Sequence, residues 1–180
     1  MKNSIVTALS IVAFLWIILI MNYIIPIDFN QYGILPRSIA GIKGILFAPF
    51  LHGNIWHLIS NTGALLVLLT GIFWMYNKIA VRVLILSAII GGGLVWILGR
   101  NASHIGASGV IFSLVGFFIF TGVFKKDFKS IILSLFVFFM YGGIIWGVFP
   151  SSPGISWEGH LFGFITGIGL AYFFKDEEME

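Results

Sequence analysis

The sequence contains no cysteine and little charge. Without cysteine, disulfide bonds, thiolate nucleophiles and cysteine-ligated metal sites are excluded. Only 9% of the residues are charged, whereas 59% are hydrophobic and the mean hydropathy is +1.05. A soluble domain of this size could not bury so much apolar surface. The composition therefore predicts an integral membrane protein with no room for a separate soluble domain.

Acidic residues are missing from the apolar segments. No Asp or Glu lies within an apolar core, and Glu158 lies only at the edge of the last one. Proton-coupled transporters usually need buried carboxylates, and the sequence offers no buried charge for a channel or transporter. The four histidines have no HExxH motif and no membrane carboxylate beside them, which argues against a zinc site. We expect neither a metal nor an organic cofactor.

Apolar segments long enough to cross a bilayer, about 20 residues each, occur at six places. They cover residues 4–25, 55–76, 79–99, 107–124, 128–149 and 157–174. The predicted fold class is an all-α polytopic membrane protein, with residues 1–180 forming one six-helix domain. Residues 26–54 contain prolines, glycines and short apolar clusters, and we expect them to form a long first loop that is partly embedded and packed against the bundle.

Lysine and arginine predict the orientation. If the N-terminus is cytoplasmic, the basic residues inside are Lys2, Lys78, Arg82, Lys125, Lys126, Lys129 and Lys175, and those outside are Arg37, Lys43 and Arg100. Because basic residues concentrate on the cytoplasmic side, both termini are predicted to be cytoplasmic. The net charge of +3 thus reflects topology and not nucleic-acid binding. We expect the three outer charges to be loop or headgroup charges, and the acidic tail at 175–180 to be disordered.

Polar residues gather where three spans enter from the outer side. The stretches are HGNIWHLISN at 52–61, HIGASG at 104–109 and WEGHLFGFITG at 157–167. His57 and Asn61 are four residues apart and share one helix face. Ser108 and His160 begin their spans at a similar depth, so we expect the four side chains to converge on one cavity below the outer surface.

These residue types match the needs of nucleophilic catalysis. A serine hydroxyl is a poor nucleophile until a base takes its proton, and histidine titrates near neutrality. A helix N-terminus and the side chains of His57 and Asn61 supply donors for an oxyanion. Each of these residues, taken alone, also has a purely structural interpretation. Ser108 could serve helix packing, and His160 could be a structural polar anchor. Asn61 could form an interhelical hydrogen bond, and His57 could be a side chain at the membrane interface. His104 is expected to be a solvated loop residue.

Glycines accompany the candidate nucleophile and base. Gly106 and Gly109 permit a tight backbone around the serine and leave space for a substrate peptide. Gly159, Gly163 and Gly167 form a GxxxGxxxG ladder on the last span, which lets two membrane helices approach closely. That approach would bring an imidazole within hydrogen-bond reach of a neighbouring helix.

The three motifs together resemble the rhomboid family of intramembrane serine proteases. The match lies in HGNIWHLISN, GASG at 106–109 and GHLFG at 159–163 with Gly167 beyond, in this order, on the second, fourth and sixth spans. The resemblance implies that Ser108 is the nucleophile and His160 the general base and later acid. It implies an oxyanion hole of His57, Asn61 and the Ser108 backbone N–H, and supporting roles for His52, Gly106, Gly109, Phe112, Gly163 and Gly167.

Two positions depart from the family pattern. Many rhomboids have a tyrosine four residues after the serine, where this chain has Phe112, so we expect stacking on the imidazole without the hydroxyl. Residues 37–48, RSIAGIKGILFA, lack the family's Trp-Arg pair, so the first loop is expected to be anchored differently. Inactive relatives typically lose the serine or the histidine, and both are present here.

The resemblance implies a serine endopeptidase in a prokaryotic plasma membrane. Its substrates would be single-span membrane proteins that enter from the lipid bilayer, with the fifth span and the loop SSPGIS at 151–156 as gate and cap. The alternative is a non-catalytic rhomboid-fold protein that binds transmembrane helices. The oligomeric state is not predicted.

Overall fold

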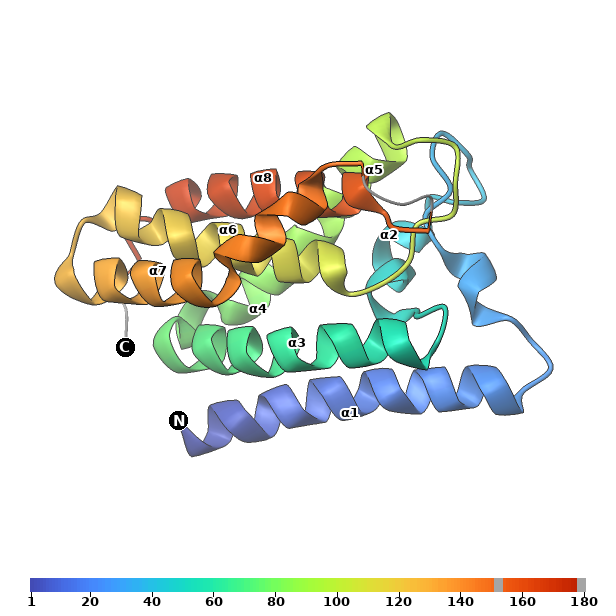
Figure 1. Cartoon of the computed structure of the whole chain (residues 1–180), viewed down its shortest axis with the longest axis horizontal. Coiled ribbons are helices and arrows are strands. Elements are labelled where there is room, and N and C mark those ends of the chain that lie inside the picture. The colour runs from blue at the N-terminus through green and yellow to red at the C-terminus, as the bar shows by residue number, and fades with distance from the viewer. Residues whose placement is uncertain (151–153, 178–180) are drawn as a thin grey trace.

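The computed structural model describes residues 1–150 and 154–177, and these form a bundle of helices (Figure 1). The long helices are α1 (Lys2–Ile24), α3 (Ile55–Met75), α4 (Asn77–Leu86), α5 (Gly92–Leu98), α6 (Ser108–Lys125), α7 (Phe128–Tyr141) and α8 (Trp157–Phe173). Shorter turns are η1 (Phe29–Tyr32), α2 (Gly44–Phe47), η2 (Ala48–Phe50), η3 (Ser87–Gly91) and η4 (Gly142–Val148). Among the described residues, the extended pairing is a single bridge between Ile34 and His104. The expected cap loop lies partly outside the described residues, at 151–153.

Five helical segments are long and apolar enough to cross a membrane. They are Lys2–Ile24, Ile55–Met75, Asn77–Leu98, Ser108–Lys125 and Phe128–Val148. The sixth predicted span, α8, has 17 residues, at the short end of the roughly 17–25 that a crossing needs. The all-α polytopic fold is thus confirmed, and a count of six crossings stays a prediction.

Polar side chains fix where three of these helices begin. Asn54 accepts a hydrogen bond from the backbone N–H of His57, Asp127 from that of Ser130, and Ser156 from that of Gly159. Side chains of this kind satisfy backbone donors that have no partner within the helix. These caps set the registers in which α3, α7 and α8 present their side chains.

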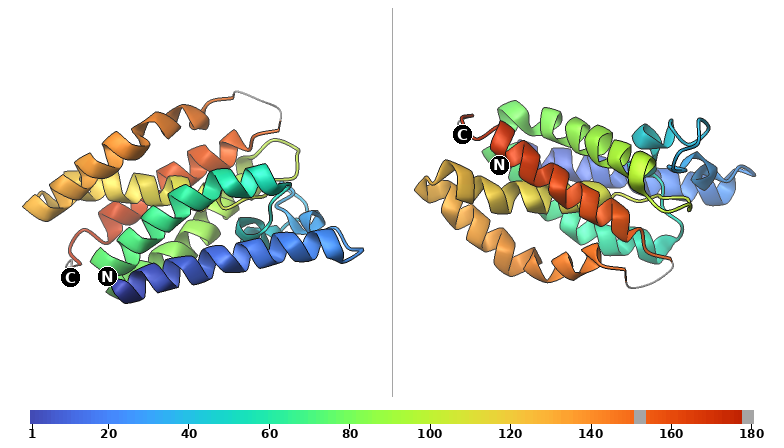
Figure 2. Two further views of the ribbon diagram at one scale, coloured as in Figure 1. Left: turned by 60° about the horizontal axis from the view of Figure 1, so that its bottom comes forward. Right: turned by 90° about the horizontal axis from the view of Figure 1, so that it is seen from above.

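Helix α6 occupies the centre of the bundle, between α8, α7 and α3 (Figure 2). In the apolar stretch of each span, 56% of the residues are buried in α6, but only 6% in the α7–η4 segment. A helix that is apolar on all sides can lie either in a protein core or in lipid. Helix α6 is an example of the first case, and the burial of the α7–η4 segment fits the second. The central helix α6 begins with Ser108, whereas most of the α7–η4 segment is not covered by the rest of the described bundle.

The first loop is anchored to the C-terminal end of α5. Arg37 has a left-handed backbone (φ 57°), and its guanidinium donates to the carbonyl oxygens of Gly99 at 2.7 Å and Ile97 at 3.3 Å. The indole N–H of Trp96 donates to the Ser38 carbonyl at 2.9 Å. An arginine of the loop and a tryptophan of α5 thus anchor it. Arg37 is an exposed residue of the first loop, as expected, and it also donates to carbonyls at the end of α5 that have no partner within the helix.

The described part of the C-terminal tail, residues 175–177, contacts the helical bundle. Glu177 pairs with Arg82 at 3.4 Å, and the Lys125 ammonium donates to the Glu177 carbonyl. The expected disorder is thus wrong for residues 175–177, while 178–180 lie outside the described residues. Both termini lie at the same end of the bundle (Figure 1).

Candidate active site

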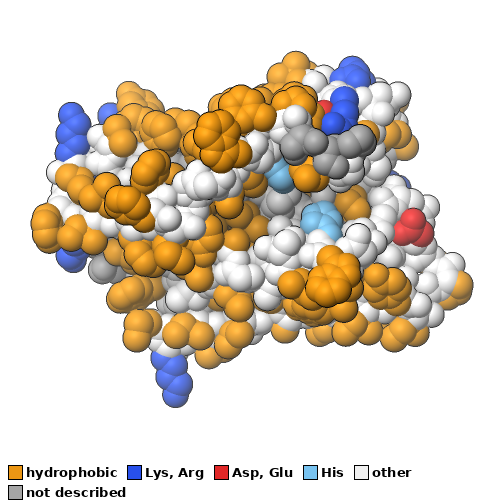
Figure 3. All heavy atoms as spheres, in the orientation of Figure 1, with side chains coloured by type: hydrophobic (Ala, Val, Ile, Leu, Met, Phe, Trp, Pro, Cys, Tyr) orange, Lys and Arg blue, Asp and Glu red, His pale blue; other side chains and the backbone are white. Residues whose placement is uncertain are grey.

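One cavity of about 640 Å³ contains the four polar side chains that the sequence analysis singled out. Its lining includes His57 and Asn61 from α3, Ser108 from α6 and His160 from α8. In the space-filling view, histidine side chains show in a hollow that hydrophobic side chains border in part (Figure 3). The structure therefore brings these residues together, as their shared depth predicted.

Ser108 and His160 are in direct contact. The distance from Ser108 Oγ to His160 Nε2 is 2.9 Å, a normal hydrogen bond between a hydroxyl and a ring nitrogen. Ser108 is the first residue of α6 and His160 lies in the first turn of α8. Because both side chains are partly buried, the pair is reachable from the cavity but shielded from bulk solvent.

The other ring nitrogen of His160 is held by the main chain. His160 Nδ1 lies 2.9 Å from the carbonyl oxygen of Gly147, in η4. A carbonyl can only accept, so Nδ1 carries the proton and Nε2 is left to accept the Ser108 hydroxyl. The Gly147 carbonyl thus fills the orienting position that a carboxylate has in a catalytic triad. The sequence analysis missed this group because a backbone carbonyl leaves no signature in side-chain patterns.

The imidazole is also held by an aromatic ring. Phe112 lies one turn after Ser108, and its ring stacks on that of His160 with centroids 4.2 Å apart and an interplanar angle of 3°. A Cβ added at Gly147 would lie 3.0 Å from the Phe112 ring and 3.2 Å from His160 Nδ1. The expected stacking is confirmed, and the absence of a side chain at position 147 makes room for it.

Asn61 is oriented by His52. The two side chains are buried, and Asn61 Nδ2 lies 3.1 Å from His52 Nε2, which the Ala107 backbone N–H approaches at 3.5 Å. Both neighbours are donors, so Nε2 is unprotonated and the proton is on Nδ1. Burial, with a smaller contribution from nearby His57, lowers the pKa of His52 to about 4, so it is neutral at pH 7. His52 therefore links the candidate oxyanion donor to the residue before Ser108.

His57 packs against the backbone that precedes the nucleophile. Its ring lies 5.1 Å from that of His52, in edge-to-face geometry. Gly106 has φ +115°, and a Cβ there would lie 2.8 Å from the His57 ring. Glycine is therefore needed at 106 both for the backbone conformation and for the space.

Glycines bring α8 against α6. A Cβ at Gly163 would overlap the Gly109 carbonyl, and one at Gly167 would overlap the Ser113 carbonyl. At Gly159 the nearest atom is instead the Ser156 hydroxyl of the helix cap, at 2.9 Å. Two positions of the predicted ladder thus make the interhelical contact, which sets the distance between Ser108 and His160.

Comparison with known proteins identifies the family. The rhomboid domain family matches residues 40–177, from the first loop through α8. The chain belongs to the rhomboid family. It is 36% identical to uncharacterised proteins of Mycobacterium tuberculosis and Mycobacterium bovis over 96% of this chain and 75% of theirs. An uncharacterised protein of Mycobacterium leprae is 35% identical over 96% of this chain and 72% of its own length.

In this rhomboid, two residues expected on the surface fasten the loop before α6 to the start of α8. His104 is 3% exposed, with Nδ1 2.7 Å from Ser156 Oγ and Nε2 3.1 Å from the Arg100 carbonyl. Arg100 Nε lies 3.6 Å from Glu158 Oε1, and its guanidinium donates to the Ile155 carbonyl at 2.7 Å. The expectation of a solvated His104 was wrong, because this residue is buried against the start of α8. Arg100 is a loop charge, as expected, and it also pairs with the buried Glu158, which needs a partner. We call these contacts the 100–158 clasp.

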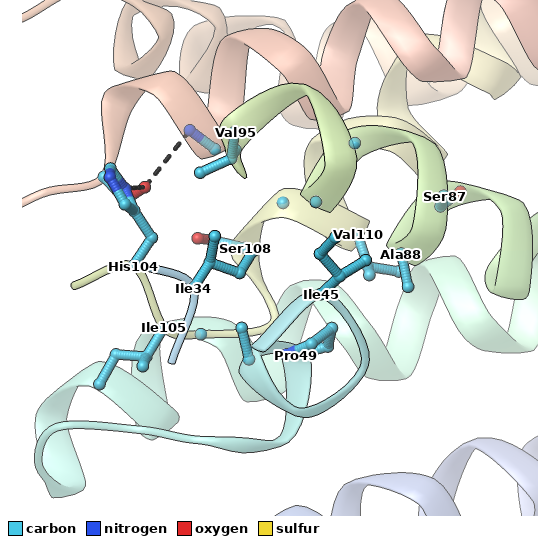
Figure 4. Close-up of a pocket in the computed structure, with 17 residues that line it drawn as sticks. Ile34, Ile45, Pro49, Ser87, Ala88, Val95, His104, Ile105, Ser108 and Val110 are labelled. Carbon is cyan, nitrogen blue, oxygen red and sulfur yellow. Dashed lines mark hydrogen bonds between the residues drawn. The ribbon is translucent and has the colours of Figure 1, made fainter. Parts of the chain in front are cut away.

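A second, small cavity of about 50 Å³ is also lined by Ser108. His104, Ser108 and Ser87 are among its lining residues, and Figure 4 shows Ser108 between the other two. The volume and the polar groups are sufficient for water. Within residues 1–150 and 154–177, we find no cluster of three His, Asp or Glu side chains that could hold a metal ion.

Proposed function

We propose that this rhomboid is an intramembrane serine endopeptidase that uses a dyad of Ser108 and His160. The observation that carries the proposal is the 2.9 Å contact between Ser108 Oγ and His160 Nε2, with Nδ1 fixed by the Gly147 carbonyl. Rhomboid proteins are generally intramembrane serine proteases, and this chain has both reacting groups.

The reaction is acyl transfer to Ser108 followed by hydrolysis. Ser108 Oγ attacks the carbonyl carbon of the scissile peptide bond while His160 Nε2 takes the hydroxyl proton. His160 then returns that proton to the leaving amine, which breaks the C–N bond and leaves an acyl ester on Ser108. In the second half, His160 takes a proton from water as the water oxygen attacks the ester, and gives it back to Ser108.

The negative charge on the tetrahedral oxygen needs donors. Backbone N–H groups of the first residues of a helix have no partner within it, which makes those of Ser108 and Gly109 available. Asn61 Nδ2 has a second N–H beyond the one directed at His52, and the His57 ring lies in the same cavity. We assign Asn61 and His57, with the Ser108 N–H, to the oxyanion hole.

The substrate class follows from where the dyad lies. Ser108 is at the start of a membrane-length helix, so the scissile bond must belong to a segment within or next to the membrane. A helical carbonyl is already hydrogen-bonded, so a substrate helix must unwind locally before cleavage. We propose single-span membrane proteins as substrates, with entry beside the weakly packed α7–η4 segment, and a six-span topology with both termini cytoplasmic.

Covalent labelling tests the dyad. A fluorophosphonate probe reacts with an activated serine, and we expect it to label wild type and Ser60→Ala but neither Ser108→Ala nor His160→Ala. Ser60 is the matched control because it lines the same cavity and donates only to the His57 carbonyl. Labelling of Ser108→Ala at the wild-type rate would overturn the nucleophile assignment. Folded wild type that stays unlabelled in both detergent and lipid would favour the non-catalytic, helix-binding alternative.

A further inference from the structure

A groove opens between α1, α3 and α4, and it shares no lining residue with the cavity of Ser108 and His160. Its volume is about 400 Å³, within the range of about 300–1,000 Å³ of ligand sites. Every lining residue is apolar: Ile11, Leu15, Leu46, Pro49, Phe50, Leu65, Leu69, Phe73, Val81, Leu84, Ile85, Ala88, Ile89, Ala107 and Val110. Leu15, Leu65 and Leu69 are buried, whereas Val81, Ile85 and Ile89 are exposed, so the groove is open on the α4 side.

A polar pocket adjoins this groove at the end of the bundle that carries the termini. It measures about 330 Å³ and is lined by Met1, Asn3, Ser4, Thr7, Phe73, Trp74 and Asn77. Phe73 borders both spaces. We call the two spaces together the α1–α4 trough.

Residues at four-residue intervals on α1 and α3 line the trough, and they are polar at one end and apolar along the rest. On α1, Thr7 is followed at four-residue intervals by Ile11 and Leu15, which share its face. On α3, Leu65, Leu69 and Phe73 follow the same spacing toward Asn77. The two helices lie side by side (Figure 1), and both contribute residues to the lining of the trough.

The length of the apolar part matches one leaflet. From Asn77 to Ala88 the chain rises about 17 Å at the helical pitch. Half of a hydrocarbon core is about 15 Å. An acyl chain that starts at the polar pocket could therefore lie along the groove from Asn77 to Ala88.

The charge around the polar pocket is positive. Lys78 precedes Val81 and Ile85 by three and seven residues and so shares their face of α4. Lys2 lies in the first turn of α1, as do Asn3 and Ser4, which line the pocket. Both lysines are exposed, and within the described parts of the chain neither is in an ion pair, whereas the nearby Arg82 is paired with Glu177. A lysine near a membrane surface attracts anionic lipid.

We propose that the α1–α4 trough binds one phospholipid with an anionic headgroup. The headgroup lies in the polar pocket beside Lys2 and Lys78, and one acyl chain fills the apolar groove. A transmembrane helix, about 10 Å wide, is too broad for this space, and a second copy of the chain would leave the polar pocket unused. The far end of the groove is formed by Ala107 and Val110, so the chain touches the helix that carries Ser108.

Native mass spectrometry of the full chain in detergent tests the site. We expect one retained phosphatidylglycerol, bound about tenfold more tightly than phosphatidylcholine. Lys78→Gln should reduce this preference about fivefold, whereas Lys129→Gln, an equally exposed lysine on α7, should leave it unchanged. Ile85→Trp should abolish retention by filling the groove, and Ile90→Trp, the same change at an exposed residue outside the groove, should not.

Three results would overturn the proposal. They are equal retention by Ile85→Trp and Ile90→Trp, equal affinity for the two lipids, and a dimer whose formation displaces phosphatidylglycerol. The thermal midpoint of each variant without lipid shows that it is folded. Because the readout is lipid retention, Ser108→Ala should bind as wild type does, so failure here is distinct from failure of the proposed protease activity.

Discussion

His160 has no carboxylate hydrogen-bonded to Nδ1, where a catalytic triad has one that orients the imidazole and stabilises the imidazolium. The Gly147 carbonyl fixes the tautomer, but it is neutral, and hydrogen bonds to neutral acceptors are roughly half as strong as those to charged ones. The Phe112 ring faces the imidazole at 4.2 Å. A cation over an aromatic face is stabilised by about 0.5–2 kcal/mol. We infer that Phe112 supports the imidazolium that forms when the proposed base takes a proton.

Asn61 offers a quantitative test of the proposed oxyanion hole. Asn61→Ala should lower kcat by about 10²–10³ with little change in KM, because the lost hydrogen bond forms only in the transition state. Turnover of a single-span substrate in vesicles measures the effect. Ser60→Ala, one residue before it and lining the same cavity, is the control. A loss of less than twofold at Asn61 would mean that the other donors suffice.

At the scale of elements, the dyad depends on how closely α8 approaches α6. The backbone of α8 at Gly163 and Gly167 touches that of α6, and Ser108 and His160 lie within one turn of the contact between Gly109 and Gly163. The distance between the helices therefore sets the distance between Ser108 and His160. The distance between Ser108 Oγ and His160 Nε2 can change by only a few tenths of an ångström before their hydrogen bond is lost.

A methyl group at Gly163 should separate the helices. Gly163→Ala should lose at least tenfold in fluorophosphonate labelling rate and about 1–3 kcal/mol of stability, because the added carbon meets the Gly109 backbone, which cannot yield. Gly169→Ala is the matched control, since nothing lies within 4 Å of that position on the same helix. Equal labelling of the two variants would show that the α6–α8 distance does not control the dyad.

The 100–158 clasp holds the start of α8, the helix that carries His160. Glu158 lies two residues before His160 and is only 2% exposed. Its partner Arg100 extends from the loop after α5, where Arg37 also binds. The ion pair therefore connects the first loop, the α5 end and the base-bearing helix.

Glu158→Gln should destabilise the protein by about 1–3 kcal/mol, because it removes the charge from a buried hydrogen-bonded group. Glu177→Gln provides the comparison: its pair with Arg82 has the same residue types, but its side chains are 41% and 54% exposed. An exposed pair of that kind contributes about 0–1 kcal/mol. Thermal unfolding in detergent measures both variants, and a larger loss at Glu177 would contradict the structural role of the clasp.

At the scale of the whole molecule, charge separates the two ends of the bundle. Seven basic residues lie on the connections and helix ends beside the termini, and three lie at the end with the dyad. This asymmetry predicts that the dyad opens toward the outer side and that the termini are cytoplasmic. Water for hydrolysis would then enter from outside.

The lack of cysteine makes this topology simple to test, because any introduced thiol is unique. In intact cells, a membrane-impermeant maleimide should label Asn101→Cys, in the exposed loop before α6, but not Lys129→Cys at the start of α7. After permeabilisation both should react. The reverse pattern in intact cells would invert the proposed orientation.

The sequence by itself determined the class of fold and the residues that are candidates for the reacting groups. The predicted spans agree with the helical segments to within two residues at each end, because length and hydropathy are local properties that the bilayer imposes. Ser108, His160, His57 and Asn61 could be singled out because uncompensated polar side chains are rare in apolar helices. Their convergence on one cavity followed from their common depth.

Only the tertiary structure decided which groups hold these residues in place. The Gly147 carbonyl, the acceptor role of His52, and the partners of Arg37, His104 and Glu158 all depend on backbone atoms or on contacts between segments far apart in the chain. A backbone carbonyl is present at every residue, so sequence cannot show which one an imidazole meets. Periodicity describes one helix at a time, and these contacts exist only where helices meet.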